Sequence, residues 1–364
     1  MVDAYRSGWI AAGPRTTRLE EAICEYTGAG HAVAVSSGTA ALHLACLAVG
    51  LGPGTSAVVP SLTFVATVNA VAHTGASVRF ADVAGTTEPW LTVSSVERAL
   101  APDTKAIMAV SYGGHLGETE GLAELAADRG ITLIEDAAHA AGSWSTRGHA
   151  GTIGDAGALS FSASKNLGVG EGGMLLTREE EMAARARSLS WHGIRSSIWE
   201  RHHGDAPEYE LGETGFNYRF DDPRAALVLA RLERLDEEND ARAVIDSAYR
   251  DALDGNAAIT PTAPPAEQER SSHYLFTAVL AEEIDRTAFR SSLASRGVQT
   301  SVHFPPAHQS GAQARHDLSL PVTEEYARRT VSLPIFPEME EWQRDLVIEA
   351  TEGALRAAAG SAAA

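Results

Sequence analysis

Lys165 is the residue whose surroundings first suggest chemistry. It lies in the stretch SFSASKNLGVGEGGMLLT, residues 160–177, where small residues precede it and several glycines follow it. A lysine amine forms a Schiff base with an aldehyde when desolvation or a neighbouring cation leaves it uncharged often enough. Because most lysines lie on the protein surface, a catalytic role for Lys165 depends on the segments that would surround it.

The glycines suggest a second interpretation, since Gly168, Gly170 and Gly173 match the GxGxxG pattern of dinucleotide-binding proteins. In those proteins the glycine run follows a strand and opens a helix, so that the helix N-terminus meets the pyrophosphate. Here the run precedes an apolar strand over 173–177, and no helix is predicted before about residue 178. The context therefore disfavours NAD binding and indicates glycines that let the backbone turn closely beside the lysine.

Asp136 lies in the segment IEDAAHA, residues 134–140, at the C-terminal end of a predicted strand. Ligands of open α/β sheets bind at this end of the strands. A pyridoxal phosphate ring needs a carboxylate at its pyridine nitrogen, because the protonated ring then absorbs the electrons of a carbanion. The alternative role for Asp136 is that of a helix N-cap, which is common for aspartate.

Two further segments carry polar groups that could bind a phosphorylated ligand. In SSGTAAL, residues 36–42, the backbone N–H groups of Gly38 and Thr39 would face a phosphate at the N-terminus of a helix. In FNYRFDDPRAAL, residues 216–227, Asn217 and Arg219 precede a capped helix. Each segment alone is weak evidence, because serine, threonine and aspartate cap helices in many proteins.

The elements that must position these residues alternate along the chain. Apolar strand-like segments at 31–37, 56–60, 76–83, 103–112 and 130–136 are separated by helix-like segments. This alternation predicts an α/β fold with a mostly parallel sheet between helices.

Residues 221–253 are predicted to form one long amphipathic helix, and a Pro-rich stretch over 260–270 follows it. Strand-like segments over 272–280 and 299–304, with further helix-like segments, predict a smaller C-terminal α+β unit. We therefore expect a large cofactor-binding domain over 1–250 and a small domain over 251–364.

The composition narrows the class of protein. A net charge of −19 disfavours nucleic acid and anionic membranes as partners. The chain contains neither an apolar run of membrane-spanning length nor a signal-peptide core, so we expect a cytoplasmic protein. Cys24 and Cys46 lie in helix-like contexts and are expected to be free thiols. The segment 191–208 holds several histidines, but their spacing fits no standard zinc pattern, so we predict a polar loop and no metal site.

Taken in order, these segments resemble one family across nearly the whole chain. The stretches SSGTAALHLA, IEDAAHAAGS, SFSASKNLGVGEGG and FNYRFDDPRAALVLARLERLDE are similar to those of the DegT/StrS-type sugar aminotransferases. This family belongs to the fold-type-I pyridoxal phosphate enzymes, which have an aspartate-aminotransferase-like large domain. The resemblance implies that Lys165 forms the covalent link to the cofactor and then moves protons, and that Asp136 pairs with the pyridine nitrogen.

The resemblance also implies roles for residues around the cofactor ring and phosphate. Phe64 would stack on one face of the ring, Ala138 would pack on the other, and His139 would lie near the ring hydroxyl. Ser160 would bind the phosphate together with Gly38 and Thr39.

Asn217 would reach the phosphate from a neighbouring subunit, which implies a homodimer with shared active sites and with residues 1–16 at the interface. Arg219, His303 and His308 are candidate substrate contacts.

The implied reaction moves an amino group from an amino acid, with glutamate expected, to a nucleotide-linked keto-sugar. The segments VSYGGH (110–115), HFPPAH (303–308) and SLPIFP (332–337) are most similar to the branch that aminates 4-keto-6-deoxyhexoses. The scarcity of lysine is typical of GC-rich genomes, which we associate with antibiotic-sugar biosynthesis. Alternatives are a 3-keto-sugar or keto-cyclitol aminotransferase, another lysine-dependent enzyme such as a lyase on the same fold, and a non-catalytic or regulatory protein that retains the fold.

Overall fold

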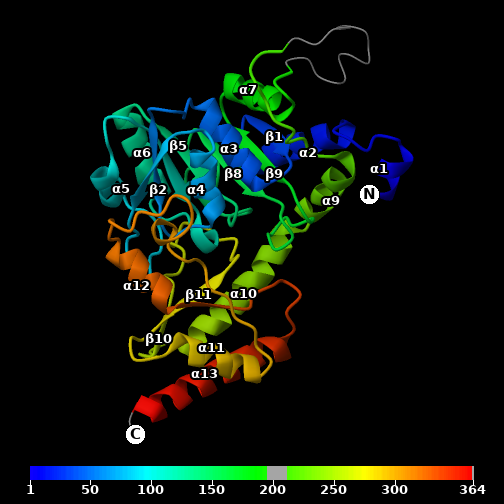
Figure 1. Ribbon diagram of the computed structural model, residues 1–364. Coiled ribbons are helices and arrows are strands. Elements are labelled where there is room, and N and C mark those ends of the chain that lie inside the picture. The colour runs from blue at the N-terminus through cyan, green and yellow to red at the C-terminus, as the bar shows by residue number, and fades with distance from the viewer. Residues whose placement is uncertain (195–210, 363–364) are drawn as a thin grey trace.

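The structure is a computed structural model that describes residues 1–194 and 211–362, and it contains one large and one small sheet (Figure 1). The large sheet has the strand order β1-β9-β8-β5-β4-β2-β3. All of these strands are parallel except β9, which runs antiparallel to both of its neighbours. Its strands are β1 (His31–Val35), β2 (Ser56–Pro60), β3 (Ser77–Ala81), β4 (Thr104–Val110), β5 (Thr132–Asp136), β8 (Ala156–Ser160) and β9 (Gly173–Thr177).

Helices cover both faces of the large sheet, because alternate residues of each strand point to opposite sides. Val33 and Val35 of β1 pack in one apolar cluster with α3 (Gly38–Ala48), α4 (Val65–Ala72) and α7 (Glu180–Ser190). Ala32 and Ala34 pack on the other side with α2 (Pro14–Thr27) and α9 (Asp222–Leu232). On that same side, Ile107 of β4 and Leu133 of β5 meet α5 (Val93–Ala99) and α6 (Thr119–Arg129). The predicted α/β layering is confirmed.

The small unit is an antiparallel sheet of β10 (Ile259–Pro261), β11 (Phe276–Leu280) and β12 (Thr330–Leu333), in that order. It packs with α11 (Arg286–Ser295) and α13 (Glu341–Ala362), and α12 (Pro321–Arg329) precedes β12. Ile245, Tyr249 and Leu253 belong to the same apolar cluster. The expected boundary at residue 250 therefore falls inside α10 (Leu235–Leu253), whose C-terminal half packs on the small sheet. The remaining elements are α1 (Val2–Arg6), a hairpin of β6 (Trp144–Ser145) and β7 (Gly148–His149), and the 3₁₀ turns Tyr112–Gly114 and Ala307–Gln309.

The prediction of one helix over 221–253 was wrong, because the structure forms α9 and α10 with a break at Glu233 and Arg234. The apolar spacing continues across the break. Leu235, at the start of α10, still packs in the core of the large unit, whereas the later apolar residues of α10 pack in the small one. Val228 of α9 packs in the large unit, whereas Tyr249 of α10 packs in the small one. The buried apolar residues Ala225 and Val228 of α9 thus lie in the large core, and α10 connects that core to the small one.

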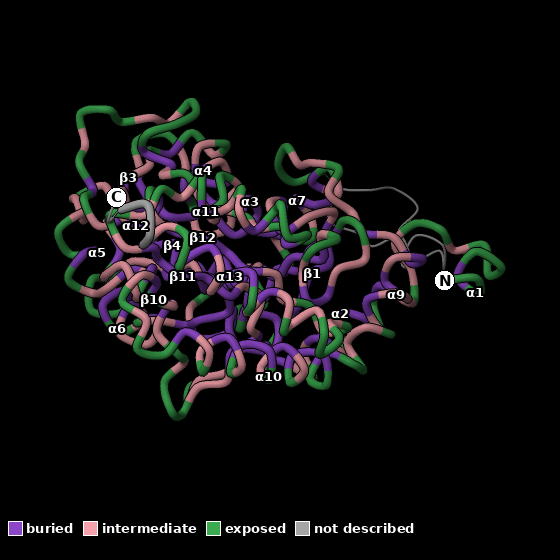
Figure 2. The backbone as a smooth tube through the Cα atoms, turned by 90° about the horizontal axis from the view of Figure 1, so that it is seen from below, coloured by how far each residue is buried: buried purple, intermediate pink, exposed green. Residues whose placement is uncertain are grey.

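The strand predicted near residues 299–304 is also absent, and Ser301 makes only an isolated bridge to Ser332. Figure 2 shows the buried backbone concentrated in the strands between the helices, while α1 extends beyond the body and is mostly exposed.

Candidate active site

The C-terminal ends of β2, β4, β5 and β8 surround a cavity of about 400 Å³. This is the edge at which a parallel sheet places the residues that follow its strands. The residues that line the cavity are Ser37, Gly38, Thr39, Leu42, Thr63, Phe64, Ala66, Val110, Asp136, Ala138, His139, Ser160, Ser162, Ser164, Lys165, Glu171, Tyr274, His303 and Phe304. Lys165 and Asp136 thus share one cavity although they come from different strand ends.

Lys165 lies in a tight loop after β8, and the glycines that follow it make that loop possible. The Lys165 N–H donates to the Ser162 carbonyl at 2.8 Å, and the Gly168 N–H donates to the Lys165 carbonyl at 2.7 Å. A Cβ at Gly168 would lie 2.5 Å from the Ala163 carbonyl oxygen, and one at Gly173 would lie 2.4 Å from the backbone of Ser37. These glycines let the backbone pack closely beside the lysine, as the sequence predicted.

Asp136, at the end of β5, is buried and held by two hydrogen bonds. Thr67 Oγ1 donates to Oδ2 at 2.6 Å, and the Ala138 N–H donates to Oδ1 at 3.2 Å. Burial raises the pKa of the Asp136 carboxyl, while these hydrogen bonds and the charge of Lys165 act to lower it. No described lysine, arginine or histidine forms an ion pair with Asp136. A protonated ring nitrogen is the kind of partner that a buried carboxylate requires.

A candidate phosphate site, here called the phosphate cradle, lies where β1 turns into α3. Ser37 caps this helix, since its Oγ accepts from the Ala40 N–H at 3.0 Å. Gly38 and Thr39 open the helix beside Ser160, and the hydroxyl of Ser160 lies at the end of β8. A helix N-terminus with neighbouring hydroxyls binds phosphate because its first N–H groups lack intrahelical partners.

The walls of the cavity are formed by Phe64, Ala138, His139 and Phe304. The Phe64 side chain is 56% exposed and its ring centroid lies 5.7 Å from that of Phe304. His139 Nδ1 accepts from the Gly113 N–H at 3.3 Å, so the proton of the neutral ring resides on Nε2. Burial lowers the pKa of His139 well below its ordinary value, and the charges of Lys165 and His303 lower it further. His139 is therefore a neutral hydrogen-bond donor inside the cavity.

The sequence profile of the DegT/DnrJ/EryC1/StrS aminotransferase family matches residues 1–352. The chain belongs to this family. The aminotransferase TlmJ from Streptoalloteichus hindustanus is 34% identical, with a TM-score of 0.91 over 98% of this chain and 94% of that one. DesV from S. venezuelae is also 34% identical, with a TM-score of 0.89 over 97% of this chain and 92% of that one. The putative sugar aminotransferase Spr1654 from Streptococcus pneumoniae, solved in a PLP form, is 26% identical, with a TM-score of 0.90 over 98% and 95% of the two chains.

The protein is therefore a pyridoxal-phosphate-dependent aminotransferase with the fold that the sequence predicted. Its own residues fit the cofactor. Lys165 supplies an amine in the cavity, and no described cation forms an ion pair with the buried Asp136. A Cβ at Gly38 would intrude between the first turn of α3 and Ser160.

The variant Gly38→Ala tests whether this turn binds the phosphate of the cofactor. A Cβ there would lie 3.0 Å from Ser160 Cβ and 3.3 Å from its Oγ, so Gly38→Ala narrows the cradle. We expect the Kd for pyridoxal phosphate to rise about tenfold, within the range that overpacking by one methyl group causes. Titration of the cofactor-free protein measures this Kd. Gly85→Ala is the matched control, since a Cβ there meets nothing within 4 Å. An unchanged Kd for Gly38→Ala would show that the cradle is not where the phosphate binds.

Two predicted cofactor or substrate residues, Asn217 and Arg219, do not line the lysine cavity of their own chain. Arg219 Nε donates to Asn217 Oδ1 at 3.3 Å, and the guanidinium lies 5.5 Å from the ring of Trp191. Arg219 lines a separate cavity together with Trp9 and Phe220.

The two histidines of HFPPAH occupy different environments. His303 lines the lysine cavity, and its Nδ1 lies 2.7 Å from Ser332 Oγ. The expectation that His308 contacts substrate is not supported, because its side chain is fully buried between Ser61 Oγ at 2.6 Å and Glu324 Oε1 at 3.2 Å. Both histidines border the same pair of prolines, so only tertiary packing separates their roles.

Sequence reasoning missed several residues of the site. Thr67 follows Thr63 by one helical turn, and their hydroxyls are 2.7 Å apart, so this pair could have been noticed from its spacing. Tyr274 and Phe304 come from the small unit, and nothing in their local sequence indicates that they reach Lys165.

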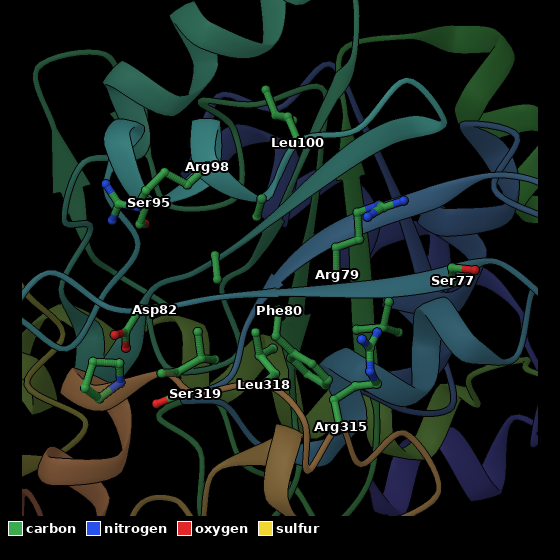
Figure 3. Close-up of a pocket in the computed structure, with 15 residues that line it drawn as sticks. Ser77, Arg79, Phe80, Asp82, Ser95, Arg98, Leu100, Arg315, Leu318 and Ser319 are labelled. Carbon is green, nitrogen blue, oxygen red and sulfur yellow. The ribbon is translucent and has the colours of Figure 1, made fainter.

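A larger cavity of about 720 Å³ lies along β3, the edge strand (Figure 3). Three of its four charged residues, Arg79, Asp82 and Arg315, have partners. Arg79 pairs with Asp103 and Arg315 with Asp317, both at 2.9 Å. Asp82 accepts from the first backbone N–H groups of α12. Lysine, histidine and cysteine are absent from its lining, so we assign it no part in the reaction.

The remaining expectations concern metals, thiols and membranes. His202, His203 and Asp205 lie outside the described residues, and within 1–194 and 211–362 no cluster of His, Cys, Asp or Glu could hold a metal ion. Cys24 and Cys46 are free thiols, as expected. Among the helices that the structure describes, none has the length and apolarity needed to cross a membrane.

Proposed function

We propose that this aminotransferase transfers an amino group from glutamate to a nucleotide-linked 4-keto-6-deoxyhexose. The observation that carries the proposal is the convergence, at the lysine cavity, of the three segments that resemble the 4-amino branch. Tyr112 of VSYGGH donates to the His303 carbonyl, and Ser332 of SLPIFP hydrogen-bonds to the His303 ring. His303 and Phe304 of HFPPAH line the cavity itself. Such a substrate would place the enzyme in deoxysugar biosynthesis, of which antibiotic sugars are one product.

The chain's own residues have distinct tasks in this reaction. When bound, pyridoxal phosphate supplies a ring that accepts the electron pair left at carbon after a proton is removed. Asp136 keeps the ring nitrogen protonated, and Gly38, Thr39 and Ser160 hold the phosphate. Lys165 Nζ would hold the aldehyde of the cofactor and, when free of it, would take the proton from the donor's α-carbon. The same amine returns a proton to the sugar carbon in the second half-reaction, so ping-pong kinetics are expected.

His303 is a suitable contact for an uncharged sugar hydroxyl. Burial lowers the pKa of His303 to about 4, and the charge of Lys165 acts in the same direction. The ring is therefore neutral above that pH and adds no further positive charge beside the lysine.

The direct test supplies ¹⁵N-glutamate with a panel of keto substrates and identifies the labelled product by mass. We expect ¹⁵N in the 4-amino sugar when a nucleotide-linked 4-keto-6-deoxyhexose is supplied. If ¹⁵N appears only in the product of a 3-keto-sugar or a keto-cyclitol, the substrate belongs to that class and not to the proposed one. No label in any substrate, with the cofactor still converted by glutamate, would show that the acceptor belongs to another class.

We also propose a homodimer with shared active sites, in which Asn217 reaches the cofactor phosphate of the other subunit. Its position away from its own lysine cavity supports this proposal. The exposed apolar side chains of Val2, Tyr5 and Ile10 support an interface that includes residues 1–16. A closed two-fold dimer would bury such a surface in both copies at once.

Mixing two inactive variants tests the shared site. In a hybrid of Lys165→Ala and Asn217→Ala chains, one site would carry both changes and the other neither. With random pairing, half of the dimers are hybrids, and each hybrid has one intact site of its two. We therefore expect the mixture to have about one quarter of wild-type activity when pyridoxal phosphate is limiting. Each unmixed variant serves as control. A mixture no more active than the separate variants would place Asn217 in the site of its own chain.

A further inference from the structure

Tyr274 is the side chain that meets the reactive amine in this structure. Lys165 Nζ donates to the Tyr274 hydroxyl at 3.2 Å and lies 4.4 Å from the centroid of its ring. The same hydroxyl lies 3.2 Å from Ser164 Oγ, and the ring packs against His139 at a tilt of 32° with centroids 4.3 Å apart. The tyrosine therefore contacts both the amine and the histidine of the cavity.

The segment that carries Tyr274 is tied to the loops that follow β4 and β5. Ser271 Oγ donates to the Gly114 carbonyl at 3.2 Å, and the Leu275 N–H donates to the Gly113 carbonyl at 3.3 Å. Ser272 Oγ donates to the His139 carbonyl at 2.7 Å. These bonds fix the backbone on both sides of the tyrosine.

A fourth bond ties the segment to the lysine loop itself. Asn166, the residue after Lys165, donates through Nδ2 to the Ser272 carbonyl at 2.9 Å, and both residues are buried. Between these anchors His273 takes a left-handed backbone conformation with φ of 47°, which few non-glycine residues adopt. The small unit thus holds Tyr274 in a fixed position beside the Lys165 amine.

We propose that Tyr274 holds and orients the amine of Lys165 whenever that amine is free of the cofactor. The phenol oxygen accepts an N–H of the amine, and Ser164 Oγ accepts the phenol proton. This arrangement leaves the nitrogen lone pair directed away from the phenol and available for the proton on carbon. After the amine has taken that proton, the ring face stabilises the ammonium charge. A long lysine side chain has many rotamers, so a fixed partner keeps Nζ within reach of carbon. The inference rests on the aminotransferase chemistry and does not depend on which sugar is the acceptor.

The variant Tyr274→Phe tests the role of the hydroxyl, because it keeps the ring and its contact with His139. We expect kcat for the glutamate half-reaction to fall about tenfold, with KM for glutamate and Kd for the cofactor unchanged, since the lost contact acts on the freed amine. Single-turnover conversion of the cofactor by glutamate, with no sugar present, measures this rate. Failure of the proposed sugar substrate would leave this measurement unaffected.

A second measurement needs no cofactor. In the cofactor-free protein, acetic anhydride labels Lys165 and Lys105, and Lys105 on β4 is exposed and serves as the internal standard. Removing the acceptor frees the Lys165 amine, so we expect its labelling in Tyr274→Phe to become about fivefold faster relative to Lys105, the effect of one net hydrogen bond. A slower turnover combined with a faster labelling is a pattern that simple loosening of the fold does not produce.

Tyr26→Phe is the matched control, since it removes a hydroxyl that donates to Asp236 at 2.8 Å outside the cavity. It should change neither measurement. Ser164→Ala removes the acceptor of the phenol proton and should shift both measurements in the same direction as Tyr274→Phe, by about two- to threefold. The proposal is overturned if Tyr274→Phe leaves the half-reaction rate unchanged, or if the rate falls together with cofactor affinity while the labelling ratio stays at the wild-type value.

Discussion

Replacing Lys165 with alanine should lower the rate of amine transfer by about 10⁴-fold or more. The variant loses both the covalent attachment of the cofactor and the base that moves protons at carbon. Because the cavity also contains Asp136 and the phosphate cradle, pyridoxal phosphate should still bind without a covalent bond. Steady-state assays give the rate, and the mass of borohydride-reduced protein shows whether the cofactor is attached.

Lys105→Ala provides the matched control for that experiment, because Lys105 is exposed on β4 and lies outside the cavity. This control should keep full activity, and digestion should locate the reduced cofactor on the peptide that contains Lys165. A cofactor attached to Lys105 in the Lys165→Ala protein, with activity retained, would contradict the assignment.

Replacing Asp136 with asparagine should lower turnover by about 10²–10³-fold, the range for removing one preorganised electrostatic contact. Asparagine keeps the size of the side chain but cannot hold the ring nitrogen in its protonated form. The rate of cofactor conversion by glutamate, measured at saturating pyridoxal phosphate, separates this effect from weaker binding.

The same substitution should have the opposite effect on the stability of the cofactor-free protein. Burial raises the pKa of Asp136 in the folded state above its unfolded value. The stabilising contribution of this group is therefore complete below the unfolded pKa and is lost as the pH rises through the folded pKa. Near neutral pH we expect Asp136→Asn to be at least as stable as the wild type without cofactor, and to gain less stability when pyridoxal phosphate is added.

Glu135 offers a control on the adjacent position of β5. It is buried, burial raises its pKa to about 7, and its carboxyl accepts from the N–H groups of Gly151, Ile153 and Gly154. Glu135→Gln should lower the denaturation midpoint with and without cofactor, because an amide cannot accept all three bonds. If Asp136→Asn behaved in the same way, Asp136 would be a structural residue and not the partner of the ring.

Some of the active site follows from sequence pattern alone. Gly38 and Asp136 come from distant parts of the chain, yet each lies at or just after the end of a strand in the predicted, mostly parallel sheet. Parallel strands present these ends at one edge of the sheet, so their proximity could be expected before the structure. The glycine run also precedes a predicted strand instead of following one, and this order excluded the dinucleotide-binding interpretation of the GxGxxG pattern.

Other features depended on how the two units pack. A continuous apolar spacing predicted one helix, but the structure forms α9 in the large core and α10, which connects the large core to the small one. His303 and His308 border the same prolines, but one lines the cavity and the other is buried against Ser61. Neither distinction is encoded in local spacing.

The sequence by itself determined the mostly parallel sheet and singled out Lys165, Asp136 and the turn at Gly38 as candidates, because helix and strand periodicity and the position of strand ends are local properties. Only the tertiary structure decided which side chains of the small unit reach that edge, Tyr274, His303 and Phe304 among them. Their approach depends on hydrogen bonds between segments more than a hundred residues apart, such as Ser272 with His139 and Asn166 with Ser272. The residue pattern of a single segment does not predict such contacts, because they form when one folded unit packs on another.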